Sequence, residues 1–402
     1  MVQAQQPQAS PPSQPKRRRP GQDWKAWPQY DAAELGLRGY WYPVTWSSKV
    51  TGTPQRQTLC GEKLVLIRDG GEVYALADRC PHRGVPLSLG RQEFPGTLTC
   101  AYHGWTFDLE SGKLCAVLTD GPKSPICGKV VQKTHPVEER HGIVWVYLGD
   151  GEEPHPLDEQ LPEEWRDGSF VLGGSMQDRR GDWRYACENG FDEGHAKYLH
   201  RTSLWRLFRT MPTWNITSIE RQGRWIHRVQ KEVHFRDEHS GLGVWTNYRW
   251  WKKKPPERVF NIGNVGDLGK PVHPVIGRQE FPGYTSISVP GVLRVVYPDF
   301  IHYEWWVPTE PGHHRYVGIM IQYREGLSTL PFYLKYFGGI RWFFHGQFSQ
   351  QDEWMVGETD APPERLYRPD ASLTAWRKLV EETTTTHEAA RAAKARRQDY
   401  DV

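Results

Sequence analysis

Two short cysteine–histidine motifs constrain this chain more than any other feature of its sequence. The first motif runs from Cys80 to His82, and seventeen residues later the second runs from Cys100 to His103. Each motif places one thiolate and one imidazole on a short segment, so the two segments together offer two sulfur and two nitrogen ligands. Zn²⁺ accepts that set. So does a [2Fe–2S] cluster that takes two Cys on one iron and two His on the other.

Glycine and proline residues between the motifs help to choose between these metals. The intervening segment contains Gly84, Pro86, Gly90, Pro95 and Gly96. Such residues fix tight, irregular backbone, which lets amide N–H groups approach the bridging sulfides of a cluster. The region does not suggest the helices that carry ligands in a zinc finger. The sequence therefore favours the iron–sulfur cluster and leaves zinc as the alternative.

The bulk properties indicate an ordinary globular chain. Its 402 residues suggest two or three domains, and its net charge of +3 lacks the basic excess of a nucleic-acid-binding protein. No apolar run reaches the ~18 residues that a membrane-spanning helix needs. Two of the six cysteines lie in the motifs and the other four are scattered. That pattern predicts reduced thiols and a cytoplasmic location.

The order of the segments predicts an N-terminal tail followed by a small all-β domain. Residues 1–22 are rich in Gln, Pro and Ser and are expected to be disordered. Strand-like runs at 64–67 and 73–76 flank a turn that contains Gly70 and Gly71, and further strands are expected at 105–108 and 143–147. We expect the first domain at 38–155, with its metal on loops between hairpins, and a second domain at 156–402.

The second domain carries a histidine pair, His195 and His200, in a segment of moderately helical pattern. Five residues on a straight helix correspond to about 140° of rotation, so two ligands of one metal could not share a face. Either the helix bends or ends between them, or they do not share a metal. Asp192, three residues before His195, would lie on the same helical face as that histidine.

Both motifs resemble the Rieske non-haem iron oxygenases, large (α) subunits. The sequences CPHRGVPLS and CAYHGWTFD are similar to their two cluster loops, and the Asp192-x-x-His195-x4-His200 pattern after Glu188-Asn189 is similar to their mononuclear-iron motif. The likeness covers residues ~38–380. It implies an α+β fold, in which an all-β Rieske domain precedes a helix-grip-like catalytic domain whose antiparallel sheet is covered by helices.

The resemblance also implies the metal ligands. Cys80, His82, Cys100 and His103 would hold the Rieske [2Fe–2S] cluster, and His195 and His200 would hold a mononuclear Fe(II). The third iron ligand of the family is a carboxylate from a late helix, which falls on Asp352, with Glu353, Glu358 and Asp360 as rivals. Two His and one carboxylate leave positions open for O₂.

Two more residues receive roles from the resemblance. Asp192 would bridge His195 to a cluster histidine of a neighbouring subunit, His103, in place of the simpler role of a solvated or capping residue. Asn189 would lie near the iron, support Asp192 or be a plain turn residue. The bridge implies a head-to-tail homotrimer, or an α3β3 assembly if a small β subunit exists.

The absence of nucleotide-binding motifs indicates which electron-transfer partners this chain needs. The chain has neither a G-x-G-x-x-G nor a P-loop motif, so electrons must come from a separate NAD(P)H-dependent reductase, with or without a ferredoxin. We therefore predict a terminal oxygenase that uses O₂ to hydroxylate a small aromatic substrate, most similar to carbazole- or phthalate-type ring dioxygenases. The alternatives are an O- or N-demethylating monooxygenase and, outside the enzymes, a Rieske electron carrier with an accessory domain.

Overall fold

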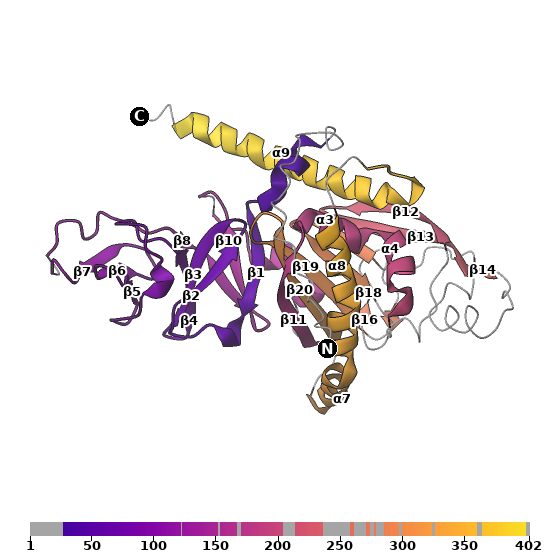
Figure 1. Ribbon diagram of the computed structural model, residues 1–402, viewed down its shortest axis with the longest axis horizontal. Coiled ribbons are helices and arrows are strands. Elements are labelled where there is room, and N and C mark those ends of the chain that lie inside the picture. The colour runs from indigo at the N-terminus through magenta and orange to yellow at the C-terminus, as the bar shows by residue number, and fades with distance from the viewer. Residues whose placement is uncertain are drawn as a thin grey trace, which may run out of the picture.

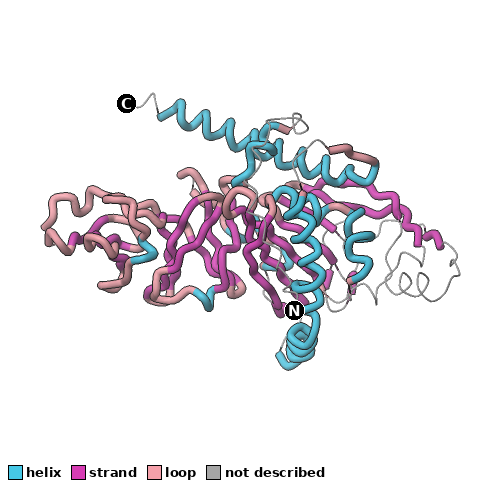
Figure 2. Tube along the Cα trace, in the orientation of Figure 1, coloured by secondary structure: helices cyan, strands magenta, loops and turns pink. Residues whose placement is uncertain are grey.

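A computed structural model describes most of the chain. The described residues are 27–121, 123–151, 153–166, 170–203, 214–235, 258–260, 271–273, 277–278, 285–296, 300–323, 326–359 and 364–398. The tail predicted at 1–22 lies outside this range. Strands occupy the middle of the molecule and helices lie around the second domain (Figure 2).

The first domain is built from short antiparallel strands, as its alternating apolar pattern predicts. The strand-like runs at 64–67 and 73–76 form β3 and β4, and Asp69 pairs with Glu72 at the tip of their hairpin. Gly70 and Gly71 there have φ angles of 56° and 96°, which suits glycine at the two central positions of a tight hairpin turn. The strands are β1 (Tyr40–Trp46), β2 (Gln55–Leu59), β3 (Glu62–Asp69), β4 (Glu72–Ala77), β5 (Thr97–Thr99), β6 (Trp105–Asp108), β7 (Leu114–Val117), β8 (Thr134–His135), β9 (Val137–Arg140) and β10 (Ile143–Leu148).

These strands form three sheets, with the orders β1-β10-β9, β2-β3-β4-β8 and β5-β6-β7. The third sheet belongs to a lobe at one end of the molecule, where Figure 1 shows β5, β6 and β7 farthest from the second domain. This cluster lobe, residues 79–131, contains both cysteine–histidine motifs.

The second domain contains one large antiparallel sheet, which confirms the predicted α+β class. Its order is β11-β20-β19-β18-β17-β13-β12, and β14 pairs with β13. The described strands are β11 (Phe170–Arg180), β12 (Trp214–Gln222), β13 (Trp225–Phe235), β14 (Arg258–Phe260), β17 (Thr285–Ser288), β18 (Val292–Val296), β19 (Ile301–Pro308) and β20 (His313–Tyr323), with β15 (Pro271–His273) and β16 (Gly277–Arg278) as a separate pair.

Helices cover one face and one edge of this sheet (Figure 1). Helix α3 packs on β17, β18 and β19, α8 contacts β11, and α9 contacts β12, β13 and α1. The helical segments are α1 (Pro28–Ala32), α2 (Leu157–Gln160), α3 (Trp183–Phe191), α4 (Glu193–Tyr198), α7 (Thr329–Lys335), the π-helical η8 (Tyr336–Phe348), α8 (Ser349–Glu358) and α9 (Ala371–Gln398); the short 3₁₀ turns include η4 (Glu163–Trp165) and η5 (Leu199–Thr202). Within the described chain, no helix combines the length and the apolar character that crossing a bilayer requires.

The apolar core is divided in an unexpected place. The largest buried cluster runs without a break from β1 and β10 of the first domain into the second-domain sheet. Trp145 on β10 contacts Trp305 on β19, with ring centroids 5.6 Å apart. The cluster lobe has its own smaller core, in which Leu98 and Phe107 are fully buried. In the described residues, the cluster lobe therefore has a core separate from the largest one, and the boundary between these two falls inside the first domain. A third, smaller cluster surrounds Met320 and Phe344 in the second domain.

Candidate metal centres

The two cluster loops share one backbone design. In the first loop, the Cys80 amide donates to the Val85 carbonyl at 2.8 Å and the Cys80 carbonyl accepts from the Gly84 amide at 2.8 Å. In the second, Cys100 makes the same two bonds, to the Trp105 carbonyl at 2.8 Å and from the Gly104 amide at 3.1 Å. Both glycines have positive φ, 75° and 65°, a conformation that favours glycine. The sequence repeat thus produces a repeated loop geometry.

The four predicted cluster ligands gather at the tips of these loops. The two thiols are buried, and the imidazole rings of His82 and His103 lie 4.6 Å apart, centroid to centroid. His82 is exposed and stacks on Trp105, with 4.7 Å between the ring centroids. Burial raises the pKa of the Cys80 thiol to about 11, so this sulfur needs a nearby cation to become a thiolate at neutral pH. Buried sulfurs and outer imidazoles fit a [2Fe–2S] cluster with its His-bound iron toward solvent.

The predicted helix carrying the histidine pair is broken twice. Helix α3 ends at Phe191, and α4 begins at Glu193 with Asp192 as its N-cap, whose carboxylate accepts from the Gly194 and His195 amides at 2.7 and 2.8 Å. Helix α4 then ends at Tyr198, and His200 lies in the following 3₁₀ turn, η5. The helix therefore ends between the two histidines, which was one of the two outcomes that their spacing allowed.

Three predicted ligands come together behind this break. The ligand atoms of His195, His200 and Asp352 all lie within 4.8 Å of one another. The Asp352 Oδ1 atom is 3.6 Å from His195 Nε2 and 3.1 Å from His200 Nε2. Asp352 comes from α8, which packs against α3 and η5. Among the described residues, this is the single group of three or more His, Cys, Asp or Glu side chains found close enough to hold one metal ion.

The donor set of this triad fits a divalent metal. His200 Nδ1 lies 2.9 Å from the amide oxygen of Gln351, which can only accept, so Nδ1 carries the proton and Nε2 carries the lone pair. That Nε2 is buried, has no hydrogen-bond partner in the described chain, and faces a carboxylate oxygen. Two electron-rich atoms at this distance require a proton or a metal cation between them. Two imidazoles and one carboxylate match the facial triad of non-haem iron proteins.

Neighbouring groups keep the Asp352 carboxylate ionised. Burial acts to raise its pKa, but the His200 and His195 imidazoles and the Asn189 amide outweigh burial and hold the pKa below its ordinary value. The Asn189 Nδ2 group donates to Asp352 Oδ1 at 3.0 Å. This hydrogen bond places Asn189 beside Asp352, and its role near the iron stays a prediction. Sequence analysis missed Gln351, although it directly precedes Asp352.

The two rival carboxylates that the structure describes, Glu353 and Glu358, are not part of the triad. Glu353 pairs with the buried Arg179 at 3.5 Å, and Glu358 is exposed near the end of α8. Asp360 lies outside the described residues. Asp192 approaches His195, with 3.6 Å between Oδ2 and Nδ1, so the carboxylate both caps α4 and faces the imidazole. The predicted contact of Asp192 with a neighbouring subunit's His103 stays a prediction.

A buried charge network holds α3 in position. The Glu188 carboxylate, one residue before Asn189, accepts from Arg377 Nε of α9 at 2.7 Å and from the Tyr30 hydroxyl of α1 at 2.6 Å. At Gly190, an added side chain would come within 2.2 Å of the Trp306 ring, so α3 can approach β19 closely only with glycine there. Sequence analysis did not identify this network, because its members come from three distant segments.

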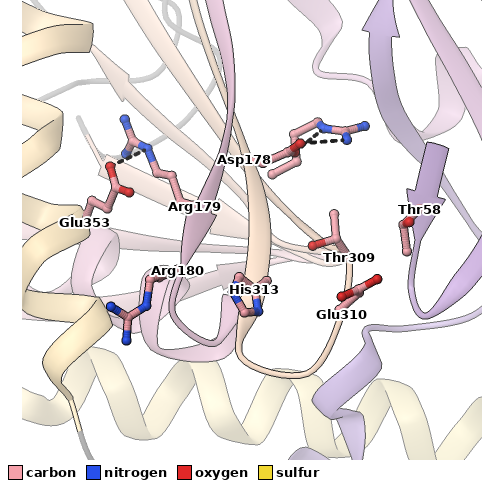
Figure 3. Close-up of a pocket in the computed structure, with 9 residues that line it drawn as sticks. Thr58, Asp178, Arg179, Arg180, Thr309, Glu310, His313 and Glu353 are labelled. Carbon is pink, nitrogen blue, oxygen red and sulfur yellow. Dashed lines mark hydrogen bonds and ion pairs between the residues drawn. The ribbon is translucent and has the colours of Figure 1, made fainter. Parts of the chain in front are cut away.

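A separate cleft lies between the two domains (Figure 3). Its volume is about 340 Å³, and it is lined by Thr58, Asp178, Arg179, Arg180, Thr309, Glu310, His313, Arg315 and Glu353. The lining is charged and none of the triad residues contributes to it. Because ligand sites for apolar compounds are mostly apolar, this cleft is a poor candidate for the binding of an aromatic molecule.

Comparisons with protein families agree with this geometry. Residues 40–125 match the family described as the Rieske [2Fe-2S] domain. Residues 147–387 match the family described as homotrimeric ring hydroxylase. The first match includes both cluster loops, and the second includes the triad.

Individual proteins are similar over nearly the whole chain. The chain is 32% identical over 379 residues to the terminal oxygenase component of carbazole 1,9a-dioxygenase from a Sphingomonas species, an alignment that covers 89% of this chain and 94% of the relative. The corresponding oxygenase structure from Nocardioides aromaticivorans IC177 matches with a TM-score of 0.69 and 31% identity, over 90% of this chain and 99% of that one. A reduced complex between oxygenase and ferredoxin in carbazole 1,9a-dioxygenase also matches, with a TM-score of 0.69, 29% identity, and coverage of 89% and 92%.

Proposed function

This chain belongs to the homotrimeric ring-hydroxylase family of Rieske oxygenases and is a terminal oxygenase component, and from that premise we propose which residues bind its metals and what it oxidises. His195, His200 and Asp352 hold the mononuclear iron. The [2Fe–2S] cluster is held by Cys80, His82, Cys100 and His103. One observation carries the proposal: the triad and the paired cluster loops occur in one chain, each with the donor set that its metal requires.

The substrate that we propose is a small aromatic compound, hydroxylated at two positions by both atoms of O₂. Support comes from the relatives, whose names give carbazole 1,9a-dioxygenase. When bound, the iron activates O₂ and the cluster supplies electrons one at a time. The residues of this chain orient that iron: Gln351 fixes the His200 tautomer, Asn189 holds Asp352, and Asp192 faces the ring N–H of His195.

Electron supply is the next part of the proposal. We infer that an NAD(P)H-dependent reductase feeds the cluster through a ferredoxin, since a related oxygenase forms a complex with ferredoxin. Within a homotrimer, Asp192 would bridge His195 to the partner's cluster. None of the six cysteines, all of which the structure describes, forms a disulfide, which supports a cytoplasmic location. The proposed domain limits remain 38–155 and 156–402.

The test combines metal analysis with isotope labelling. We expect about three iron atoms per chain, two in the cluster and one at the triad, and a product that contains two atoms from ¹⁸O₂ when reductase and ferredoxin are supplied. Asp352→Asn should lose the single iron and the product while keeping the visible absorption of the cluster. Glu358→Gln, on the same helix, is the matched control and should change neither.

Other outcomes would identify the alternatives. Incorporation of one oxygen atom with release of formaldehyde would indicate the demethylating monooxygenase. Two iron atoms per chain without oxygen uptake would indicate the electron carrier and refute the proposed function.

A further inference from the structure

A second pair of histidines lies beyond the metal triad. His302 is on β19, two residues before Glu304, so both side chains point to the same face of the sheet. His345 is on η8, seven residues before Asp352, which is about two helical turns. The rings of His302 and His345 lie 5.4 Å apart, centroid to centroid. The central sheet and η8, which leads directly into the helix that carries Asp352, therefore each contribute one imidazole to the same point.

Both imidazoles are buried, and each has at least one ring nitrogen without a partner among the described residues. His302 and His345 are each 1% exposed. The Nε2 atom of His302 and both ring nitrogens of His345 have no hydrogen-bond partner among the described residues, and neither has the buried hydroxyl of Tyr336, whose ring lies 6.0 Å from that of His345. Buried polar groups in native proteins nearly always have a partner. Four unpartnered atoms in one place indicate a site for atoms that another molecule supplies.

The pair is uncharged at neutral pH. Burial, together with Arg179 and Arg341, lowers the pKa of His345 to about 3. Burial, and to a smaller extent the neighbouring His345, lower the pKa of His302 well below its ordinary value. Each ring therefore offers one N–H donor and one lone pair. The Glu304 carboxyl, 3.9 Å from His302 Nδ1, would repel an anion when ionised.

A series of stacked rings joins the triad to this pair. Phe348 stacks on the metal-site His200 with centroids 3.6 Å apart, and Phe344 stacks on Phe348 at 5.1 Å. Phe344 in turn meets His302 edge-on at 4.6 Å. Aromatic rings are thus in contact all the way from the triad to the imidazoles. Aromatic side chains with a few polar groups are the usual surroundings of a bound aromatic ligand.

We propose that His302 and His345 form a polar subsite that binds an uncharged hydroxyl or ring N–H group of the aromatic substrate at the end of the site away from the iron. The inference rests on the proposed function and specifies its substrate class. The preferred substrate is a neutral aromatic compound with one hydrogen-bonding group, ahead of an unsubstituted hydrocarbon and ahead of an aromatic carboxylate.

The test measures binding without turnover, in the metal-loaded holoenzyme and without O₂. Three ligands of equal ring size, naphthalene, 2-naphthol and 2-naphthoate, are titrated by calorimetry. We expect 2-naphthol to bind about tenfold more tightly than naphthalene, and 2-naphthoate to bind more weakly than naphthalene. His345→Phe and His302→Phe should each remove the preference, so that 2-naphthol and naphthalene bind to the variant with equal Kd. His345→Gln, which keeps a donor and an acceptor, should retain part of the preference.

Controls separate this inference from the proposed function. His313→Phe, at an exposed position, should leave all three Kd values unchanged, and the cluster absorption of each variant reports folding. Equal binding of naphthol and naphthalene in the unaltered protein, or a preference that survives both phenylalanine variants, would show that the imidazoles hold water only and would overturn the subsite. Oxygen uptake with naphthalene in that case would leave the oxygenase function standing. The expected preference for 2-naphthol without any oxygen uptake would instead overturn the proposed oxygenase function.

Discussion

The two metal centres of this chain are built in opposite ways. The cluster ligands lie within one continuous stretch, residues 80–103, on two loops with the same hydrogen bonds and a small core of their own. The triad joins α4, η5 and α8, and the Asn189–Asp352 hydrogen bond spans 163 residues. A local site depends on its own loops, whereas a dispersed site depends on the packing of the whole domain. The two centres should therefore respond differently to the same perturbation.

Removal of a triad ligand should produce the largest difference between the responses of the two metal centres. His195→Ala should abolish product formation because one of three ligands is lost, yet the red-brown cluster should remain, since its four ligands all lie on the loops of residues 80–103. Iron analysis, visible spectra and product assay measure this together. Retained turnover would refute the ligand role of His195.

Loss of a distant support should also damage the triad. Arg377→Met leaves the Glu188 carboxylate buried without its partner, and such a change costs roughly 3–5 kcal/mol. Both side chains are almost fully buried, at 1% and 7% exposure. We expect a lower free energy of unfolding in denaturant titrations and less iron at the triad, with normal cluster absorption. An equal loss of both metals would show that the centres are not independent.

Removal of one charge should slow electron transfer between the two centres without loss of metal from either. Asp192→Asn keeps an N-cap for α4, because Asn caps as well as Asp, but it removes the carboxylate that faces His195. We expect both metals to remain and electron transfer from cluster to iron to slow by about 10–100-fold. Single-turnover kinetics after reduction of the cluster measure this step. Unchanged kinetics would count against the bridge between subunits.

A pair of glycine substitutions tests the local site. Gly104 has a φ of +65°, and an added methyl group would lie 2.7 Å from the Leu118 side chain; Gly96 has a φ of +73° with open space around it. In both alanine variants, backbone strain should lower the free energy of unfolding by about 1 kcal/mol. In Gly104→Ala, overpacking should lower it by about 1–3 kcal/mol more. Equilibrium unfolding followed at the cluster band gives both values, and triad iron should be unaffected. Equal losses of stability in the Gly104→Ala and Gly96→Ala variants would mean that the Leu118 side chain moves aside at little cost.

Acid should weaken the second domain through its buried histidines. Burial lowers the pKa of His314 on β20 to about 4, below the ~6.5 of an unfolded chain. Between pH 6.5 and 4, His314 therefore binds a proton in the unfolded state but not in the folded state. As the pH drops through this range, the free energy of unfolding falls by about 1.4 kcal/mol per pH unit. His314→Gln should flatten this slope and the exposed His313→Gln should not, as measured by unfolding at several pH values.

The same contrast explains what could be predicted from the sequence. The strands at 64–67 and 73–76 and both cluster loops were predictable, because alternation, turn glycines and ligand spacing are local signals. The end of the helix between His195 and His200 followed from their spacing as one of two outcomes. Asp352 came from resemblance alone.

Contacts made only in the folded chain could not be predicted. The Glu188–Arg377 pair and the His200–Gln351 hydrogen bond each join segments more than a hundred residues apart. The surroundings of Glu304 likewise depend on the position of Asp352 on α8. A sequence pattern gives no sign of such pairings. Burial and the Asp352 carboxylate raise the pKa of Glu304 to about 7, and nothing in its strand-like surroundings predicts that environment.

The division of the core inside the first domain bears on how this enzyme could be re-engineered. Exchange of the N-terminal domain with that of a relative at residue 155 would cut through the apolar contacts of Trp145 with Trp165 and Trp305. A transplant limited to residues 79–131 would move both loops together with most of the small core that supports them. Chimaeras built at that narrower seam are therefore the ones that should keep a functional catalytic half while acquiring a cluster of different reduction potential.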